Sequence, residues 1–392
     1  MTILDALSRI YRKTGIHAAP PGTILHGFNA KVHSIIHRRA RTFASIDTIS
    51  RGTFGGIPYY NLSRLRQSRP VNGIALVFFL GAGDYLMATP MIKALHEAHP
   101  DLPIWAYVSS HADSVNSPLV AHLLKVNPLI HRVSTYRGRP RAVWTEYDFS
   151  DALKDIPPDF AVLPVIYDTD AAVMHRGTSL LETFGLRVDL PIPVPIAYKA
   201  PISDAGQEIL TSILDRYRSD RPRGVVCMHF GARSSGYDYP HAARLAWMLI
   251  QRGFQIVSFT PTALRNENLT EVDITKLNVT DSIELLRGLK SEIPHLTMLS
   301  VNSLMWPISA ALGIPNLGLH IFCDPSIHQY LYPNIYVMTR HLYRSISPCR
   351  LFLAPTTSYE EREPPGGPTK FTDYKPEFVA DSLETMFGLL EA

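Results

Sequence analysis

One aspartate stands out because it follows a buried-strand candidate and a pair of glycines. Residues 74–80 form an apolar run, and Gly81-Ala82-Gly83-Asp84 comes directly after it. A strand that breaks into glycines and then into a helix is how a parallel α/β sheet presents a ligand-facing loop. This position makes Asp84 a candidate for proton transfer.

Two interpretations of Asp84 compete on spacing alone. Its carboxylate could cap a helix by accepting backbone N–H groups of the first turn. Alternatively, it could face a cleft and remove a proton from an acceptor hydroxyl. Thr89-Pro90 bears on the choice, since Thr is a good N-cap and Pro suits the first helical position. The regular helix could therefore begin at Thr89-Pro90, which would release Asp84 from capping.

The elements that must position Asp84 are alternating strands and helices, which indicate a parallel α/β domain. In the first half we expect a helix near residues 90–99 and strands at 74–80, 103–108, 130–135 and 160–165. A Pro-dense stretch at 190–195 is typical of an extended linker. The chain before residue 73 is an addition, with one basic helix expected over 33–50.

The second half repeats this organisation. We expect strands at 224–230, 255–259, 296–301 and 316–321, and helices at 241–252, 282–289, 306–312 and 376–390. Two such units predict an α/β protein with two Rossmann-like domains facing across a cleft.

Two ordered motifs resemble a known family. The first comprises Leu80-Gly81-Ala82-Gly83-Asp84, Ala88-Thr89-Pro90 and residues 92–95, and the second comprises residues 309–315, Asp324-Pro325 and residues 332–334. Together they resemble the heptosyltransferase-like glycosyltransferase family 9, which has the GT-B fold. The resemblance implies an inverting glycosyltransferase in which Asp84 is the general base.

The resemblance also implies a domain organisation. We expect a basic N-terminal extension (1–72), an acceptor domain (73–195), a nucleotide-sugar domain (196–372) and a C-terminal helix returning to the first domain (373–392).

A nucleotide-sugar donor needs groups that hold its diphosphate, and helix starts and cations can do so without a metal. No cofactor is therefore expected. The candidate donor-binding residues are Gly231, Arg233, Ser234, Ser235, Asn302, Ser303 and Asp324. The candidate acceptor-binding residues are Gly83, Arg132, Arg137, Arg139 and Arg141. For the arginines, a solvated basic loop is the alternative.

The donor loops depart from the family pattern. Tyr237 stands where members carry Lys, and Asn302-Ser303-Leu304 replaces Asp-(Ser/Thr)-Gly, with Pro307 at the following His position. Because Leu304 has a side chain where Gly would let the backbone approach a ligand, the donor is either bound differently or no longer bound.

The amino-acid composition indicates which class of protein this is. The chain has 392 residues, of which 46% are hydrophobic and 19% charged, as expected of a globular protein with two cores. No apolar run of about 20 residues is present, and the N-terminus is unlike a secretory signal. The three cysteines match no zinc or disulfide spacing. We therefore expect a cytoplasmic protein.

Charge is unevenly distributed. Residues 1–72 carry eleven basic and two acidic side chains, a net +9, so the remainder carries −6. The extension could thus meet an anionic membrane at the inner face, a phosphorylated glycolipid or an acidic partner. A solvated basic surface, or docking on the protein's own body, is the alternative. We expect no nucleic-acid partner.

Three functions are compatible with these features. The first is sugar transfer, with heptose as one candidate, to a bacterial surface glycan or glycoconjugate. The second is a catalytically degenerate GT-B protein that binds a glycan or a partner. The third, a dinucleotide-dependent oxidoreductase, is disfavoured because Leu86 occupies the third glycine position of the fingerprint.

Overall fold

The fold is described here from a computed structural model. The described residues are 53–54, 62, 66–67, 69–78, 82–109, 117–136, 147–148, 154–165, 194–231, 238–273, 277–301, 303–319, 332, 334–339, 350–353 and 374–391. They divide into two compact units, Met1–Pro193 and Val194–Ala392. The expected helix over 33–50 lies outside the described residues.

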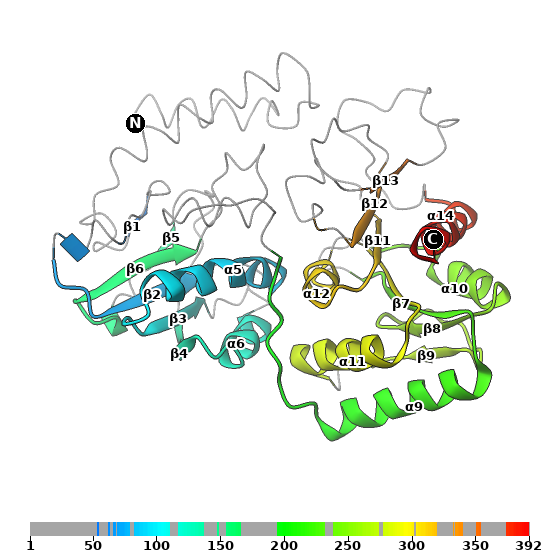
Figure 1. The fold of residues 1–392 in the computed structure, drawn as a ribbon, viewed down its shortest axis with the longest axis horizontal. Helices are drawn as coiled ribbons and strands as arrows, with labels where there is room; N and C mark the ends of the chain where they lie inside the picture. The colour runs from blue at the N-terminus through cyan, green and yellow to red at the C-terminus, as the bar shows by residue number, and fades with distance from the viewer. Residues whose placement is uncertain are drawn as a thin grey trace, which may run out of the picture. The chain divides into compact units, whose positions relative to one another are not determined.

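The first unit contains a parallel sheet with the strand order β4-β3-β2-β6 (Figure 1). Its strands are β2 (Gly73–Phe78), β3 (Ile104–Ser109), β4 (Ile130–Tyr136) and β6 (Phe160–Val165). Every residue of β2 is buried, as an apolar and β-branched sequence allows in a strand covered on both faces. The helices α5 (Ala82–Ala98) and α6 (Ser117–Lys125) contact each other and link these strands. A separate antiparallel pair joins β1 (Thr53–Phe54) to β5 (Tyr147–Asp148).

The second unit contains a seven-stranded parallel sheet with the order β13-β12-β11-β10-β7-β8-β9. The strands, in chain order from β7, are Gly224–His229, Phe254–Ser258, Leu269–Glu271, Leu296–Val301, Asn316–Leu319, Ile335–Thr339 and Arg350–Leu353. The helices are α9 (Asp204–Asp220), α10 (Ala242–Gln251), α11 (Val279–Glu292), α12 (Met305–Leu312) and α14 (Pro376–Glu391). In both units the strand order reverses beside the first strand, which is the arrangement of a Rossmann-like sheet.

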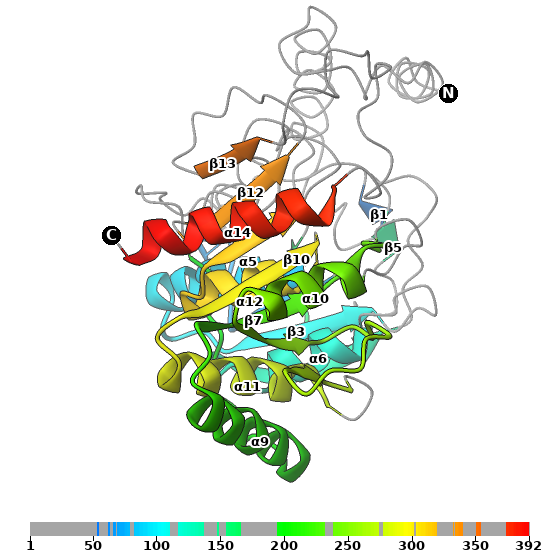
Figure 2. The same ribbon diagram turned by 90° about the vertical axis from the view of Figure 1, so that its right-hand side faces the viewer.

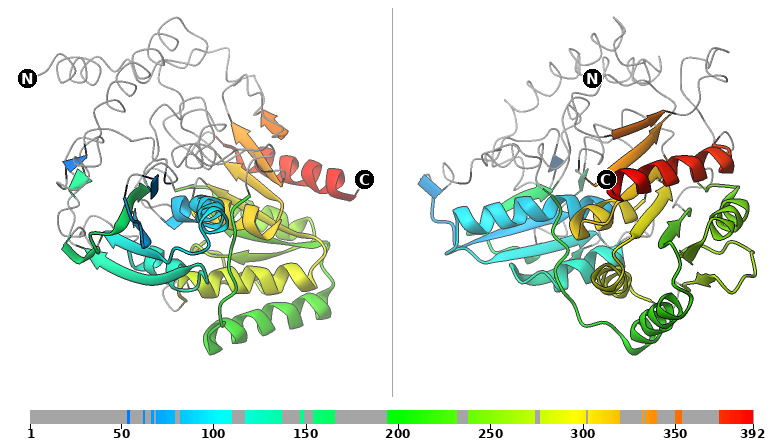
Figure 3. Two further views of the ribbon diagram at one scale, coloured as in Figure 1. Left: turned by 60° about the vertical axis from the view of Figure 1, so that its left-hand side comes forward. Right: turned by 45° about the vertical axis from the view of Figure 1, so that its right-hand side comes forward.

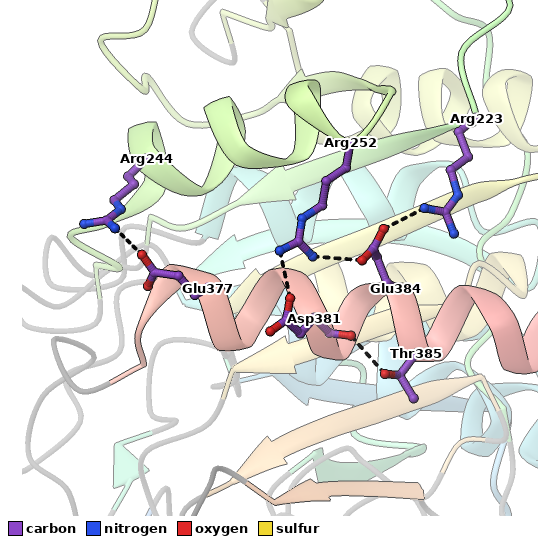
Figure 4. Close-up of polar contacts among 7 residues, drawn as sticks. All are labelled: Arg223, Arg244, Arg252, Glu377, Asp381, Glu384 and Thr385. Atoms are coloured by element: carbon purple, nitrogen blue, oxygen red, sulfur yellow. Dashed lines mark hydrogen bonds and ion pairs between the residues drawn. The ribbon is translucent and has the colours of Figure 1, made fainter.

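The last helix, α14, belongs to the second unit and lies beside α10 (Figure 2). Its buried residues Val379, Leu383 and Phe387 join the apolar core under α10, and the rings of Phe387 and Phe254 are 4.9 Å apart. A row of ion pairs between α14 and three arginines, the ion-pair seam, borders this core (Figure 4). In this seam, Arg252 contacts Asp381 at 2.7 Å and Glu384 at 2.9 Å. Arg223 also contacts Glu384 at 2.6 Å, and Arg244 pairs with Glu377.

The seam and its core hold α14 on the second unit. The physical reason is that its apolar face completes the core formed by α10 and the sheet, while its acidic residues meet three arginines of that unit.

The segment before α9 contacts α11, and α9 itself lies beside α11 (Figure 3). Three side chains spaced every third residue on α11 hold three backbone groups spaced every third residue on the segment. Arg287 donates to the carbonyl of Ala197 at 2.8 Å, Glu284 accepts from the N–H of Ala200 at 3.1 Å, and Asp281 accepts from the N–H of Ser203 at 2.8 Å. Residues 197–203 are therefore an integral part of the second unit.

The prediction of an α/β protein built on two parallel sheets is confirmed. The expected strands at 74–80, 103–108, 130–135, 160–165, 224–230, 255–259, 296–301 and 316–321 are all present, and no end differs by more than two residues. Helix α5 differs more, because it begins at Ala82 rather than near Pro90.

Candidate active site

Asp84 lies where the first sheet reverses its strand order. It is the third residue of α5, shortly after the carboxyl end of β2, and β2 is the strand flanked by β3 on one side and β6 on the other. Ligands of open α/β sheets bind at such a switch point, outside the carboxyl ends of the strands. The residue is half-buried in the first turn of the helix.

The helix start differs from the sequence-based expectation that Thr89 caps it. Pro90 lies inside α5, and Thr89 is fully buried within the helix. Proline has no N–H for the carbonyl of Leu86, four residues earlier. The hydroxyl of Thr89 donates to that carbonyl instead, at 2.6 Å. Because the carbonyl keeps a partner, the helix continues through the proline, and Asp84 stands in its first turn after all.

Of the candidate acceptor residues, Gly83 adjoins Asp84, whereas Arg132 lies elsewhere in the sheet. Gly83 precedes Asp84 in α5 and is half-buried. Arg132 lies earlier on β4, opposite Trp105 on β3, and its guanidinium is 4.7 Å from the centre of that ring. The structure thus places Arg132 against an aromatic face rather than at the carboxyl edge. Arg137, Arg139 and Arg141 lie outside the described residues.

The first candidate donor loop follows β7, at the switch point of the second sheet. Its first two backbone N–H groups, those of Phe230 and Gly231, both donate to the hydroxyl oxygen of Thr260, at 3.0 and 3.2 Å. The N–H of Gly231 is therefore engaged within the protein. Arg233, Ser234 and Ser235 lie outside the described residues.

The second candidate donor loop follows β10, the strand beside β7. Ser303 is half-buried, and its hydroxyl oxygen accepts from the N–H of Met305 at 3.3 Å. This serine therefore bonds the N–H of the first residue of α12, and its hydroxyl proton can still be donated. Asn302 and Asp324 lie outside the described residues.

A buried polar network fixes α12 to the sheet. Asn316 on β11 donates to the hydroxyl of Ser309 at 3.0 Å and lies 3.3 Å from that of Ser300, and all three side chains are fully buried. Ser309 in turn donates to the carbonyl of Met305 at 2.6 Å. The middle of α12 is thereby tied to the first residue of β11.

His229 is a candidate that the sequence interpretation did not select. It ends β7 and pairs with Ser300 of β10, so it stands at the switch point itself. Its Nδ1 is buried and has no hydrogen-bond partner in the part of the chain that the structure describes. Burial lowers the pKa of this imidazole to about 4, so the ring is neutral at pH 7. A histidine at a strand end was a visible signal, although its burial was not.

Two arginines of the basic extension contact the first unit. Arg66 forms two hydrogen bonds with the carboxylate of Asp101, at 3.1 and 2.6 Å. Arg69 donates to the carbonyls of Pro158 and Phe160 at 2.7 and 2.9 Å. For these two side chains, docking on the protein's own body is the observed arrangement. The other basic residues of the extension lie outside the described residues.

The described residues contain no group of three or more His, Cys, Asp or Glu side chains arranged to hold a metal ion. They also contain no helix with the length and apolar character needed to span a bilayer.

Comparison with known proteins shows a likeness in structure. No family model matches the sequence, and no curated protein matches it. A solved glycosyl transferase of family 9 from Veillonella parvula superposes with a TM-score of 0.52 at 12% identity, covering 82% of this chain and 98% of that one. At this identity the likeness concerns the fold, which is α/β with two parallel sheets and consistent with GT-B.

Two further structures match over a similar span. The Escherichia coli ADP-heptose lipopolysaccharide heptosyltransferase II has a TM-score of 0.45 at 16% identity, covering 82% of this chain and 100% of that one. The E. coli heptosyltransferase WaaC with ADP has a TM-score of 0.42 at 15% identity, covering 80% and 99%.

Proposed function

We propose that this chain is an inverting, metal-independent glycosyltransferase in which Asp84 is the general base. The observation that carries the proposal is the position of this carboxylate, in the first turn of α5 and beside the strand-order reversal of a Rossmann-like sheet. The family 9 likeness in fold supports it.

In the proposed reaction, Asp84 takes the proton of an acceptor hydroxyl as its oxygen attacks the anomeric carbon of the donor sugar. The bond from that carbon to the nucleoside diphosphate breaks, and its electron pair leaves with the diphosphate. Attack opposite the leaving group inverts the anomeric configuration. A positioned base of this kind contributes roughly 10²–10⁴ in rate.

We assign the donor to the second unit. The loops after β7 and β10 flank its switch point, and Ser303 retains a hydroxyl proton for a phosphate or ribose oxygen. The resemblance to family 9 makes an ADP-sugar the first donor to test, and the E. coli heptosyltransferase WaaC has been solved with ADP and with ADP-2-deoxy-2-fluoro heptose. For the acceptor we propose a bacterial surface glycan or glycoconjugate, and for the basic extension a contact with an anionic membrane.

The test combines nucleotide binding with turnover. Thermal stabilisation by ADP and by UDP reports donor-site binding, and release of ADP from ADP-heptose reports chemistry. Asp84→Asn should lower turnover at least 100-fold while ADP binding stays unchanged. The matched control is Glu97→Gln, which neutralises an exposed carboxylate on the same helix and should leave turnover within twofold. Wild-type turnover in Asp84→Asn would refute the assigned base.

A degenerate binding protein is the second candidate. It is favoured by the engagement of the N–H groups of Phe230 and Gly231 with Thr260, since these groups are then not directed at a phosphate. It predicts that no nucleotide or nucleotide-sugar stabilises the protein.

A further inference from the structure

Tyr85, the residue after the proposed base, is tied to a distant part of the first unit. Its ring is buried, with 1% of its surface exposed. Its hydroxyl donates to the backbone carbonyl of Leu123 at 3.1 Å and accepts a hydrogen bond from Nδ2 of Asn127 at 3.2 Å. One side chain thereby connects the first turn of α5 to the end of α6.

Asn127, which binds the hydroxyl of Tyr85, is itself held by several hydrogen bonds. Asn127 is buried, and its Oδ1 accepts from the N–H of Leu129 at 3.0 Å. Its backbone carbonyl accepts from the N–H of Ile130 at 3.1 Å, at the first residue of β4. The hydroxyl of Tyr85 is therefore held by a turn that continues directly into the sheet.

The ring of Tyr85 also meets the strand that leads to Asp84. It packs edge to face against Phe78, the last residue of β2, with ring centres 5.8 Å apart. Tyr85 thus joins the last residue of β2 to the first turn of α5.

The first turn of a helix needs such support. Its N–H groups have no acceptor within the helix, so helix starts tend to fray. A catalytic carboxylate in this turn must nevertheless keep its geometry, because a displacement of about 1 Å can cost a large factor in rate.

We propose that Tyr85 is a positioning residue that holds the carboxylate of Asp84 in place through its bonds to Leu123 and Asn127. The proposal rests on the proposed role of Asp84 as base. Tyr85 itself touches no substrate in this account.

The experiment compares two buried tyrosines of the first unit, one on α5 and one on β3. Tyr85→Phe removes the anchoring hydroxyl and keeps the ring. Tyr107→Phe is the matched control, since Tyr107 is equally buried on β3 and donates to the carbonyl of Asp155 at 3.2 Å. Each variant therefore loses one hydroxyl that donates to a backbone carbonyl.

The first readout needs no substrate. In protein labelled with ¹³C-aspartate, the carboxyl carbon signal of Asp84 is identified by its loss in Asp84→Asn. It should shift or broaden at constant pH in Tyr85→Phe and stay unchanged in Tyr107→Phe. An unchanged signal in both variants, or an equal change in both, would overturn the proposal.

The second readout is turnover with ADP-heptose. Tyr85→Phe should lower kcat at least fivefold with the donor KM within twofold of wild type, whereas Tyr107→Phe should change neither. Equal kcat values for the two variants would overturn the positioning role. Full activity in Asp84→Asn would instead refute the proposed function, so the two failures are distinguishable.

Discussion

The indole of Trp306 lies directly on the backbone of Gly318. A Cβ placed on this glycine would be 2.0 Å from Cζ2 of the indole, a distance at which one of the two groups must move. Trp306 is fully buried in the first turn of α12, and Gly318 is on β11. This contact sets how closely α12 approaches the sheet at the end where the proposed donor loop arrives.

Gly318→Ala should therefore lower stability and disturb the start of α12. Overpacking of this kind costs about 1–3 kcal/mol, measured as the free energy of unfolding in urea. The affinity for ADP should fall as well, because Ser303 begins the displaced turn. Gly388→Ala is the control. It lies in α14 with no atom within 4 Å of the added methyl group, so it should raise stability by roughly 0.5–1 kcal/mol.

The hydroxyl of Thr89 should be needed for α5 to pass through Pro90. Thr89→Val keeps the shape of the side chain and leaves the buried carbonyl of Leu86 without this donor. An unsatisfied buried group costs about 1–3 kcal/mol, so the melting temperature should drop. Thr89→Ser, which retains the hydroxyl, should lose clearly less stability. Equal losses in the two variants would mean that packing, and not the hydrogen bond, supports the helix.

His229 should make the protein less stable in mild acid. Its pKa is about 4 in the folded protein, against 6.5 for an unperturbed histidine. Between these values the unfolded chain binds a proton that the folded chain does not, so the free energy of unfolding falls as the pH falls. From pH 6.5 to 4.5 this one group should contribute a loss of about 2 kcal/mol.

Urea unfolding of wild type and His229→Asn at several pH values measures this contribution. The variant should lose less stability than wild type over this range, because the buried ring is gone. Two curves that stay parallel would show that His229 takes up its proton without unfolding the protein.

Much of the sheet structure could be predicted from the sequence, because each central strand is a short apolar run. Strand β6 was expected over 160–165 and occupies Phe160–Val165. Helix α9 was not predicted, since its buried surface is narrow and rests on Leu210, Ile213 and Leu214 among many polar residues. The short strand β9 has only three residues and too little pattern to recognise.

The site was harder to predict than the fold. The strand order puts Asp84 after β2 and the two candidate loops after β7 and β10, the strands beside the points where the order reverses. Local rules failed at Thr89-Pro90, because a side-chain hydrogen bond replaced the one that proline lacks. The hydrogen bond from Gly231 to Thr260 joins residues 29 positions apart that follow two neighbouring strands, and no local pattern encodes it.

The three hydrogen bonds between residues 197–203 and α11 determine where the chain can be cut to obtain the second unit by itself. A fragment that begins at Asp204, the first residue of α9, would leave Asp281, Glu284 and Arg287 on α11 without the backbone groups they bind. A fragment that begins at Val194 keeps them all. Anyone expressing the second unit alone should start at the earlier residue.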